Sequence, residues 1–431
     1  MSTFFSELQK RNLVKQVTDP RLESILDQRA LTLYSGFDPT SDSLHVGNLL
    51  QIALLRRFQD CGHRPIALIG GATGRIGDPS GKNQERSLLD EKVIEKNIQG
   101  VEKTLRRVLD GLGKTKALYL NNEAWMNQFG YLEFLRDVGK HFSVNQMMHK
   151  DSVKARLEDR EQGISYTEFS YMLIQAYDFY HLNQSHQCQL QIGGSDQWGN
   201  ITAGCELIRR LHAHQGSSPS VEPMGLTSPL ITKSDGSKYG KSEKGAVWLD
   251  PDKTAPYEFY QFFIQTGDDQ SLELLRLFTF LPLEEIAEIE KEFKKSPENR
   301  LAQKTLAFEL TCWIHGESEA KKAKKASETF FQKSISDLTL DEINTLYEDA
   351  PSPTLNRSLL ESGLQLVDLL VLSKIAASKG AARRDIQGGG IYLNDQRTTD
   401  PQRIITAEDL LHDSVLILKR GKKRVTLVRF Q

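Results

Sequence analysis

The first half of the chain repeats one order of segments: an apolar run, a loop rich in glycine and polar residues, and an amphipathic helix. The apolar runs at 31–37, 64–71 and 188–194 have the length and composition of buried strands. Helix-forming stretches begin near Val46 and near Asp196. Strands that alternate with helices indicate a parallel sheet, because parallel neighbours need a long crossover between them. The fold class that we predict is therefore α/β.

Three loops at 34–48, 70–82 and 193–200 follow the ends of these predicted strands. They are rich in glycine and polar residues. In open parallel sheets, ligands bind beyond the carboxyl ends of the strands. We therefore expect a binding site where these three loops meet.

The rest of the 431 residues changes character twice, and a chain of this length is expected to hold two or three domains. From about Asp250 the pattern is helical, the stretch 341–358 is acidic with two prolines, and the tail suggests two short helices and a hairpin. The predicted parts are a parallel-sheet domain at 1–247, an α-helical domain at 248–333, a linker at 334–363 and a small α+β domain at 364–431.

Composition narrows the class of protein. The chain is 39% apolar and 26% charged, which is typical of a soluble globular protein. No apolar run approaches the roughly 20 residues that a membrane span needs, and charges interrupt the first residues, so we expect neither a membrane span nor a signal peptide. The four cysteines form no CxxC pair, which favours reduced thiols in the cytosol and argues against a zinc site.

The tail carries a charge that the whole chain does not. From Leu364 to Gln431 there are twelve Lys and Arg against seven Asp and Glu, while the chain has a formal net charge of −2. A basic segment on an acidic body suits a polyanion such as a nucleic acid. A solvated basic surface without a partner is the alternative that charge alone leaves open.

The glycine-rich loop at 70–81, GGATGRIGDPSG, does not fit a phosphate-binding template. Lys82 is followed by Asn83, no glycine lies five residues before Gly81, and the loop does not match GxGxxG. A plain turn is one interpretation, and a backbone lying close to a ligand is the other. Its single carboxylate, Asp78, would suit a bound ammonium group.

The predicted helix at 166–182 carries polar residues on one face. Tyr171, Gln175 and Asp178 are spaced i, i+4 and i+7, and Ser165 with Glu168 forms a capping box at its start. Apolar residues crowd the rest of the helix, so these polar groups need hydrogen-bond partners. Either neighbouring side chains or a polar ligand can supply them.

The stretch 234–245, SDGSKYGKSEKG, places Lys238, Lys241 and Ser242 on a flexible loop. Lysines on such a loop can close over phosphates as mobile charges. An exposed lysine loop without a binding role is the competing interpretation.

Taken in order, YSGFDPT…HVGN, GGATGRIGDPSG, TEFSYMLIQAYDF, QIGGSDQWGN and KYGKS resemble the bacterial tyrosyl-tRNA synthetases, a family of class I aminoacyl-tRNA synthetases. HVGN at 45–48 stands where the class has HIGH, and KYGKS at 238–242 stands where it has KMSKS. The second His of HIGH is Asn48 here; an amide can still donate a hydrogen bond, so we expect activity to survive. The basic tail is similar to a small RNA-binding domain first described in a ribosomal protein.

The resemblance implies a Rossmann-like catalytic domain, a helical anticodon-side domain and an RNA-binding tail. It also implies a two-step reaction. The carboxylate of L-tyrosine attacks the α-phosphate of ATP, and the tyrosyl group of the adenylate then passes to the 3′ end of tRNA(Tyr). Further implications are Mg²⁺ bound with the nucleotide, a homodimer and a cytoplasmic location.

The resemblance assigns residues to the nucleotide. Thr40 and His45 match donors to the ATP phosphates, and Lys238, Lys241 and Ser242 match a loop that closes over the leaving pyrophosphate. Lys82 and Arg86 are added as neighbours without a family motif behind them. The further nucleotide contacts implied are Gly36, Asp38, Gly47, Asn48 and, at the ribose, Asp196, with Lys241 again.

The resemblance also assigns residues to the amino acid. Those matched to the tyrosine ammonium are Asp78, Tyr171 and Gln175, those matched to the phenol hydroxyl are Tyr34 and Asp178, and the one near the carboxylate is Gln197. Phenylalanine would leave Tyr34 and Asp178 buried without a partner, which is a large penalty.

Three other functions remain to be weighed. A tryptophanyl-tRNA synthetase would not need the Tyr34 and Asp178 pair. A nucleotidyltransferase of the wider HxGH superfamily predicts neither the KYGKS loop nor an RNA-binding tail. An RNA-binding protein built on an inactive synthetase predicts loss of phosphate-handling residues such as His45 and Lys238, which are present.

Overall fold

The structure is a computed structural model that describes residues 3–80, 90–150, 153–154, 164–232, 239–242, 245–332, 335–347, 350–421 and 424–431. The chain divides into two compact units, Met1–Lys324 and Lys325–Gln431. Each unit has a hydrophobic core of its own.

A six-stranded sheet in the order β1-β6-β5-β2-β3-β4 forms the centre of the first unit. Its strands are β1 (Gln16–Val17), β2 (Thr32–Phe37), β3 (Arg64–Ile69), β4 (Leu118–Asn121), β5 (Cys188–Gly194) and β6 (Met224–Ser228). All neighbours pair in parallel except β1, which pairs antiparallel with β6 at the edge. The predicted α/β class with a parallel sheet is confirmed, and the three predicted strands are β2, β3 and β5.

The strand order places the candidate site. β3 and β4 are added on one side of β2, and β5 and β6 on the other. The order of the strands therefore reverses between β2 and β5, where the loops that follow the two strands leave in opposite directions. Such a switch point opens a crevice at the carboxyl ends of the strands.

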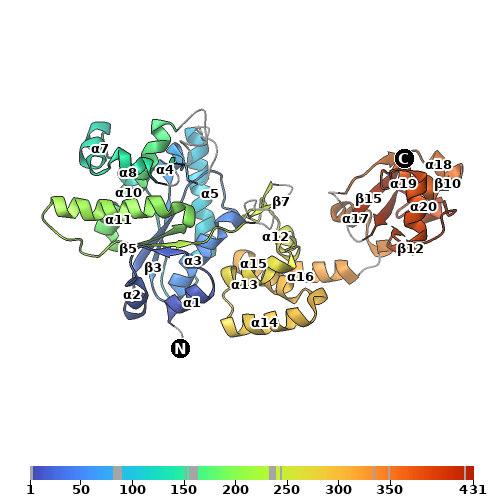
Figure 1. Ribbon diagram of the computed structural model, residues 1–431, viewed down its shortest axis with the longest axis horizontal. Coiled ribbons are helices and arrows are strands. Elements are labelled where there is room, and N and C mark those ends of the chain that lie inside the picture. Colours follow the sequence, from blue (N-terminus) through green and yellow to red (C-terminus); the bar gives the residue numbers. More distant parts are fainter. Residues whose placement is uncertain are drawn as a thin grey trace. The chain divides into compact units, whose positions relative to one another are not determined.

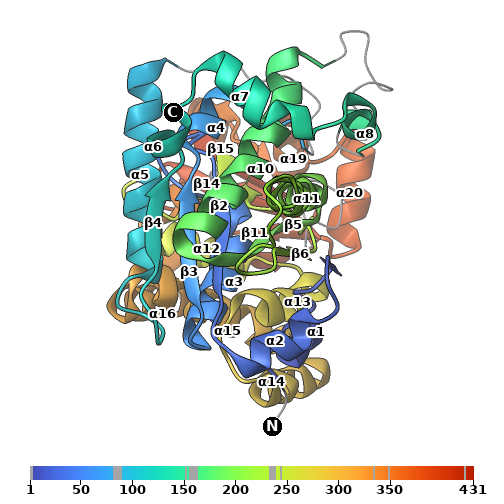
Figure 2. The same ribbon diagram turned by 90° about the vertical axis from the view of Figure 1, so that its left-hand side faces the viewer.

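Helices cover both faces of this sheet (Figures 1 and 2). Leu33 and Ile69 lie in the core shared with the helices α3 and α5, whereas Tyr34 and Leu68 lie in the core shared with α10 and α11. Alternate residues of a strand point to opposite faces, which explains the division. The bounds are α1 (Phe4–Lys10), α2 (Leu22–Gln28), η1 (Val46–Asn48), α3 (Leu49–Asp60), α4 (Gly71–Ile76), α5 (Glu91–Leu109), α6 (Glu123–Met126), α7 (Tyr131–Asp137), η2 (Gly139–His141), α8 (Val144–Met148), α10 (Tyr166–His186), η3 (Ser195–Gln197) and α11 (Trp198–His214).

The helix α10 begins as its sequence predicts. Ser165 Oγ accepts the backbone N–H of Glu168 at 3.2 Å, which satisfies one of the unpaired amides of the first turn. The helix ends at Gln187, which adopts a left-handed conformation with φ of 52°. Tyr171, Gln175 and Asp178 are thus carried on one continuous helix.

A helical segment completes the first unit. Its helices share one hydrophobic core with α3 and α5, to which Phe259, Phe278 and Leu310 contribute. The elements are β7 (Lys241–Ser242), β8 (Gly245–Ala246), α12 (Pro256–Ile264), α13 (Asp268–Phe278), α14 (Leu283–Lys295), η4 (Pro297–Asn299), α15 (Leu301–His315) and α16 (Glu317–Gln332), which continues past the unit boundary. The boundary predicted at 247/248 stays a prediction.

The second unit combines a five-stranded sheet in the order β12-β11-β14-β15-β9 with short helices. Leu369 of α19 and Ile386 of α20 pack against Leu416 and Val428 of this sheet. The elements are η5 (Ile335–Asp337), α17 (Leu340–Leu346), β9 (Thr354–Leu355), α18 (Ser358–Glu361), β10 (Leu364–Gln365), α19 (Leu366–Leu372), α20 (Lys379–Gln387), β11 (Ile391–Leu393), β12 (Gln396–Thr398), β13 (Ile404–Ile405), η6 (Ala407–Asp409), β14 (Val415–Arg420) and β15 (Arg424–Phe430).

The segment 334–363 differs from the linker that its composition predicts. Ile335, Leu338 and Ile343 are buried against β14 and β15, and β9 extends the sheet in parallel beside β15. The carbonyls of Pro351 and Pro353 accept the backbone N–H groups of β15. Prolines are tolerated there because an edge segment needs to donate no inner hydrogen bond. The prolines therefore mark a sheet edge.

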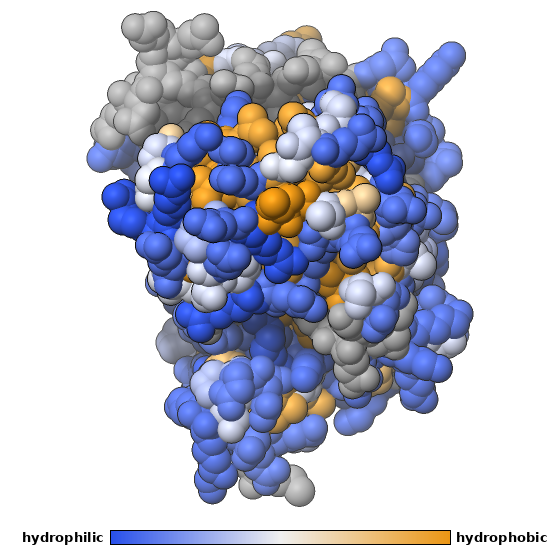
Figure 3. Space-filling view, turned by 90° about the vertical axis from the view of Figure 1, so that its right-hand side faces the viewer, coloured by the Kyte–Doolittle hydropathy of each residue, from blue (hydrophilic) through white to orange (hydrophobic). Residues whose placement is uncertain are grey.

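Three observations bear on the predictions made from composition. Within the described ranges, no helix is long and apolar enough to cross a membrane. All four cysteines are free thiols. Hydrophilic residues make up most of the face drawn in Figure 3, with apolar residues between them.

Candidate functional site

Two polar side chains are buried together beneath the switch point. Tyr34 of β2 and Asp178 of α10 are each 1% exposed. The Tyr34 ring lies against that of Phe179, with 5.4 Å between ring centroids, and its hydroxyl has no hydrogen-bond partner within the described residues. Burial raises the pKa of Tyr34 well above its ordinary value, and the nearby Asp178 charge raises it further. The hydroxyl therefore stays protonated at neutral pH.

Asp178 is held by two donors that come from the end of β4. Its Oδ1 accepts a hydrogen bond from Trp125 Nε1 at 2.8 Å, and its Oδ2 accepts one from Asn122 Nδ2 at 2.9 Å. Burial raises the pKa of Asp178 to about 7, against the opposing effect of the two hydrogen bonds. The carboxyl is thus poised between its two ionisation states at neutral pH, and a further donor would favour the carboxylate.

A second cluster joins the loops after β3 and β5 to the helix α10 by side-chain hydrogen bonds. Gln197 Nε2 donates to Asp78 Oδ2 at 2.6 Å, and Gln197 Oε1 accepts from Gln175 Nε2 at 3.2 Å. Asn200 Nδ2 donates to both glutamine oxygens, at 3.0 Å to Gln175 and 3.1 Å to Gln197. The loops after β3 and β5 therefore meet α10 here. The resemblance expects Gln197 near a carboxylate, and in the structure this side chain contacts Asp78 on the predicted ammonium side.

Tyr171 belongs to a neighbouring set of contacts. Its hydroxyl donates to Asp38 Oδ2 at 3.0 Å, and Asp38 Oδ1 accepts from Thr73 Oγ1 at 2.8 Å. Asn122 Nδ2 donates to the same Thr73 oxygen at 3.1 Å. One chain of hydrogen bonds thus runs from Tyr171 to Asp178 through Asp38, Thr73 and Asn122. The structure places Asp38 within this chain, and its contact with nucleotide stays a prediction.

The HVGN segment forms its own cap at the start of η1 and α3. His45 Nδ1 accepts the backbone N–H of Gly47 at 3.0 Å, and Asn48 Oδ1 accepts the backbone N–H of His45 at 3.1 Å. A neutral imidazole that accepts at Nδ1 carries its proton at Nε2, so Nε2 is the donor of this ring. A Cβ atom on Gly47 would lie 2.7 Å from His45 Cε1, so a side chain there would displace the imidazole.

The described part of the KYGKS segment packs directly on HVGN. Gly240 has φ of +100°, and a Cβ atom on it would lie 2.5 Å from the backbone nitrogen of Gly47. Val247 N–H donates to the Gly240 carbonyl at 3.2 Å, and Val46 N–H donates to the Val247 carbonyl at 2.9 Å. Trp248 also pairs with His45 through an isolated bridge, with 5.8 Å between the two rings. Two motifs some two hundred residues apart in sequence therefore share one surface.

The other predicted nucleotide residues lie at the ends of β2 and β5. Gly36 of β2 is exposed, and a Cβ atom there would meet no described atom within 4 Å. Thr40 is exposed, and its N–H donates to the Asp38 carbonyl at 2.8 Å. Asp196 is half-buried in η3, directly after β5. Lys238, Lys82 and Arg86 lie outside the described residues, as do the side chains of Lys241 and Ser242.

Five described residues of the site were not predicted from the sequence, the first being Thr73 of the GGATGRIGDPSG motif. Asn122 and Trp125 follow β4, and its apolar run ALYLN resembles the other strands, so the strand could have been predicted from the sequence. Asn200 lies within the QIGGSDQWGN motif. Gln191 of β5 is 2% exposed and lies beside Tyr34 in register, and its Oε1 has no partner among the described atoms.

Comparisons with known proteins show the family to which the chain belongs. Residues 26–332 match the family of class I tRNA synthetases for tryptophan and tyrosine, and residues 342–428 match the C-terminal domain of tyrosine–tRNA ligases. The chain is 47% identical over 431 residues to the tyrosine–tRNA ligase of Roseiflexus castenholzii, covering 100% of both chains. It is 50% identical over 428 residues to that of Geobacillus stearothermophilus, covering 99% of each.

Solved structures extend the likeness to the fold. A C-terminally truncated mitochondrial tyrosyl-tRNA synthetase of Aspergillus nidulans matches with a TM-score of 0.69 and 33% identity, over 76% of this chain and 94% of that one. The tyrosyl-tRNA synthetase of Archaeoglobus fulgidus has a TM-score of 0.53 at 17% identity, over 74% of this chain and 99% of that one, and supports the fold alone. With a family model over most of the chain and sequence relatives over its whole length, the chain belongs to the tyrosine–tRNA ligase family of class I tRNA synthetases and is an aminoacyl-tRNA synthetase.

Proposed function

We propose that L-tyrosine binds lengthwise between the two polar clusters. Its phenol hydroxyl meets Tyr34 and Asp178, and its ammonium group meets the cluster of Asp78, Tyr171 and Gln175. The observation that carries this proposal is the burial of the Tyr34 hydroxyl, without a partner among the described residues, together with the buried Asp178 carboxyl, which hydrogen bonds through Asn122, Thr73 and Asp38 connect to Tyr171. A phenol supplies the third donor for Asp178, and an unpartnered buried polar group would cost about 1–3 kcal/mol.

The first chemical step is the activation of tyrosine with ATP, which class I tRNA synthetases use. A tyrosine carboxylate oxygen bonds to the α-phosphorus as the bond between that phosphorus and the β-bridging oxygen breaks, and pyrophosphate leaves. A carboxylate is already a nucleophile, so no general base is required. The contribution of the protein is alignment of the reactants and neutralisation of phosphate charge. We assign the phosphate contacts to Thr40, His45, Lys238, Lys241 and Ser242.

The tautomer of His45 supports its part in this step. Its Nδ1 accepts the Gly47 amide, so the ring presents an Nε2–H donor without needing a positive charge. The start of η1 and α3 adds unpaired amides and a partial positive charge that favour anions. Adenine lies against Gly36, Gly47 and Asn48 in this proposal, and Asp196 binds the ribose hydroxyls. Asp38 completes the nucleotide contacts.

Mg²⁺ enters this proposal as a companion of ATP. The described residues hold no group of three or more His, Cys, Asp or Glu that could bind a metal ion. The side chains in the described part of the chain therefore do not fit a resident metal site, and no step is assigned to one. Mg²⁺ is commonly held by substrate phosphates with few protein ligands, which suits a nucleotide-borne ion.

The second step transfers the tyrosyl group to the 3′ end of tRNA(Tyr). We assign tRNA binding to the basic segment 364–431, since Lys and Arg that neutralise phosphates supply most sequence-independent affinity for nucleic acids. The helical segment 248–333 is assigned to the anticodon side. Charging of tRNA serves translation, so we place the reaction in the cytoplasm.

We also propose that the chain forms a homodimer. Large apolar side chains are exposed close together in sequence on α7, α8 and the start of α10: Tyr131 at 65%, Leu132 at 78%, Val144 at 57%, Met148 at 43% and Tyr166 at 61%. Exposed apolar side chains of this size favour burial against a partner. Sedimentation of the wild-type chain and of Leu132→Asp tests the assignment, and equal masses at the monomer value would refute it.

Pyrophosphate exchange into ATP, run with each protein amino acid in turn, tests the activity. We expect exchange with tyrosine and none with phenylalanine or tryptophan at matched concentrations. Exchange with tryptophan would favour the tryptophanyl enzyme, whose substrate cannot satisfy the Tyr34 and Asp178 pair in the same way. Exchange without any amino acid would favour another nucleotidyltransferase, and RNA binding without exchange would favour the inactive RNA-binding alternative.

A further inference from the structure

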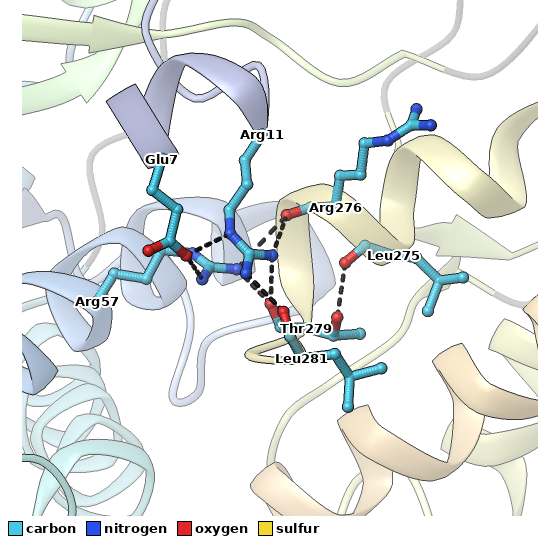
Figure 4. Close-up of polar contacts among 7 residues, drawn as sticks. All are labelled: Glu7, Arg11, Arg57, Leu275, Arg276, Thr279 and Leu281. Carbon is cyan, nitrogen blue, oxygen red and sulfur yellow. Dashed lines mark hydrogen bonds and ion pairs between the residues drawn. The ribbon is translucent and has the colours of Figure 1, made fainter. Parts of the chain in front are cut away.

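Two arginines from different helices are buried together at the end of a third helix (Figure 4). Arg11, which directly follows α1, is 1% exposed, and Arg57 of α3 is 5% exposed. They share one carboxylate: Glu7 Oε1 lies 2.8 Å from Arg11 Nε and 4.0 Å from Arg57 Nη1. Two positive charges beside one partly exposed carboxylate leave an excess of positive charge in a buried place, so other groups must stabilise it.

The end of α13 supplies those groups. Arg11 Nη1 donates to the carbonyls of Arg276 and Thr279 at 3.3 Å each, and its Nη2 donates to the Leu281 carbonyl at 2.6 Å. Arg57 Nη2 also donates to the Thr279 carbonyl. The last carbonyls of a helix have no partner within the helix and carry its negative dipole end. Burial lowers the pKa of Arg57 to about 9, with Arg11 beside it as a further cause, so Arg57 remains charged at neutral pH.

The backbone at this helix end explains why outside donors are needed. The chain leaves α13 at Thr279 in an extended conformation, with φ of −85° and ψ of 157°. Thr279 N–H and Thr279 Oγ1 both donate to the Leu275 carbonyl, at 3.2 Å and 2.7 Å, and the extended chain beyond does not turn back as a left-handed glycine cap would. The two arginines donate to the carbonyls of Arg276, Thr279 and Leu281. The position of this helix end is thus set by side chains of α1 and α3.

The helix α13 also contacts the chain just before the lysine-bearing loop 234–245 and one described residue within that loop. Before the loop, the carbonyl of Thr232 accepts Gln270 Nε2 at 2.9 Å. Within the loop, the buried ring of Tyr239 lies 6.3 Å from that of Phe278, the last residue of α13. These two parts of the chain are joined to each other, since Tyr239 N–H donates to the Ile231 carbonyl at 3.3 Å. Displacement of α13 would therefore move Tyr239 and, with it, Gly240 away from Gly47.

We infer that Arg11 and Arg57 are positioning residues for nucleotide activation: they fix the end of α13, which keeps the Tyr239–Gly240 turn against the HVGN helix start. Neither arginine contacts a residue assigned to tyrosine or ATP in the contacts described above. The inference rests on the proposed function only in assigning the lysine loop to ATP phosphates. Three contacts do not depend on that assignment: Arg57 with the end of α13, α13 with Tyr239, and Gly240 with Gly47.

The variants Arg57→Met and Arg57→Lys test the inference, with Arg56→Met as the matched control. Arg56 also lies on α3, and its guanidinium lies over the Phe280 ring at 5.4 Å, as that of Arg57 does at 5.0 Å. Arg56 pairs with Asp60 but donates to no α13 carbonyl in the described contacts. Tyrosine binding without ATP should change by less than about twofold in every variant, because the tyrosine cluster does not involve α13. Tyrosine-dependent pyrophosphate exchange should fall by about tenfold or more in Arg57→Met, through KM for ATP or kcat.

Conservative replacement and a second readout separate positioning from general destabilisation. Arg57→Lys keeps one cationic donor and should recover part of the pyrophosphate exchange that Arg57→Met loses. If Arg57→Met does not fold, Arg57→Lys is compared directly with the wild-type chain. Amide hydrogen exchange of the peptide 239–249 should quicken in Arg57→Met and stay unchanged in Arg56→Met, since Val247 N–H bonds to Gly240. Unchanged protection of this peptide, or equal loss of tyrosine and ATP binding, would overturn the inference. A wild-type chain without tyrosine-dependent exchange would instead overturn the proposed function.

Discussion

Asp178 concentrates the chemistry of recognition in one carboxyl group. Its two donors, Trp125 and Asn122, leave acceptor capacity unused, and burial holds its pKa near the pH of the cell. A carboxylate with two oxygens can accept more hydrogen bonds than these two. A ligand that brings a hydroxyl donor is therefore favoured over one that brings a hydrogen atom at the same position.

Asp178→Asn removes the charged acceptor, and it should weaken discrimination of tyrosine against phenylalanine more than it weakens nucleotide binding. A hydrogen bond to a charged group contributes about 1.5–3 kcal/mol, so kcat/KM for tyrosine should fall by roughly 10- to 100-fold relative to phenylalanine. KM for ATP should change little, because Asp178 contacts none of the residues assigned to the phosphates. Exchange kinetics with both amino acids measure the ratio, and an unchanged ratio would remove Asp178 from the phenol site.

Discrimination should also depend on pH. The folded pKa of Asp178, about 7, lies above its ordinary 3.8, so below about 7 the carboxyl keeps a proton and accepts the phenol less well. The ratio of kcat/KM for tyrosine to that for phenylalanine should therefore rise with pH through about 7; groups common to both reactions cancel in the ratio. Trp125→Phe deletes a donor that lowers this pKa, and should shift the midpoint upward. A ratio that is flat between about pH 5.5 and 8.5 would contradict the assignment.

At the scale of elements, the site depends on how two motifs meet. The start of η1 and α3 is capped by His45, and the Tyr239–Gly240 turn packs against that cap. Hydrogen bonds from Val247 and Val46 make this contact continuous with the backbone. Each motif is recognisable in sequence, but their contact depends on the strand order and on the packing of α13.

Gly240→Ala tests this contact against a control with the same backbone strain. Gly240 and Gly245 both have positive φ, +100° and +115°, so alanine is strained at either position. Only at Gly240 would the new Cβ atom meet Gly47; at Gly245 no described atom lies within 4 Å. Exchange should fall about tenfold or more in Gly240→Ala and within about threefold in Gly245→Ala, as measured by kcat and KM for ATP. Equal losses would assign the effect to strain alone.

At the scale of the whole molecule, the division into two units bears on the division of labour that we propose between adenylate formation and tRNA binding. The residues assigned to adenylate formation all lie in the first unit, and the basic segment lies in the second. Each unit is described with its own core. The basic segment 364–431 therefore lies within the second unit, which begins earlier in the chain, at Lys325.

Truncation after Gln332, the last residue of α16, should spare tyrosine-dependent exchange and reduce aminoacylation of tRNA by about 100-fold or more, because it removes the phosphate-binding charges. The truncation after about Gly363 that the sequence suggests is a poorer design. It would leave Ile335, Leu338 and Ile343 without the strands that bury them. We expect the chain truncated after Gly363 to be less soluble, as measured by its recovery in the supernatant. Loss of both exchange and aminoacylation in the chain truncated after Gln332 would contradict the proposed separation of adenylate formation from tRNA binding.

The sequence by itself determined the strands β2, β3 and β5, the helices α3, α10 and α11, the capped start of α10 and the motifs of the family. These signals are local, because apolar periodicity and capping residues act within a few positions of one another. Only the tertiary structure decided that Asn122 and Trp125 hold Asp178, that Arg11 and Arg57 hold α13, and that the proline-containing segment 350–355 is a sheet edge. Those contacts join residues far apart in sequence, and the order and packing of the strands and helices decide which of them meet.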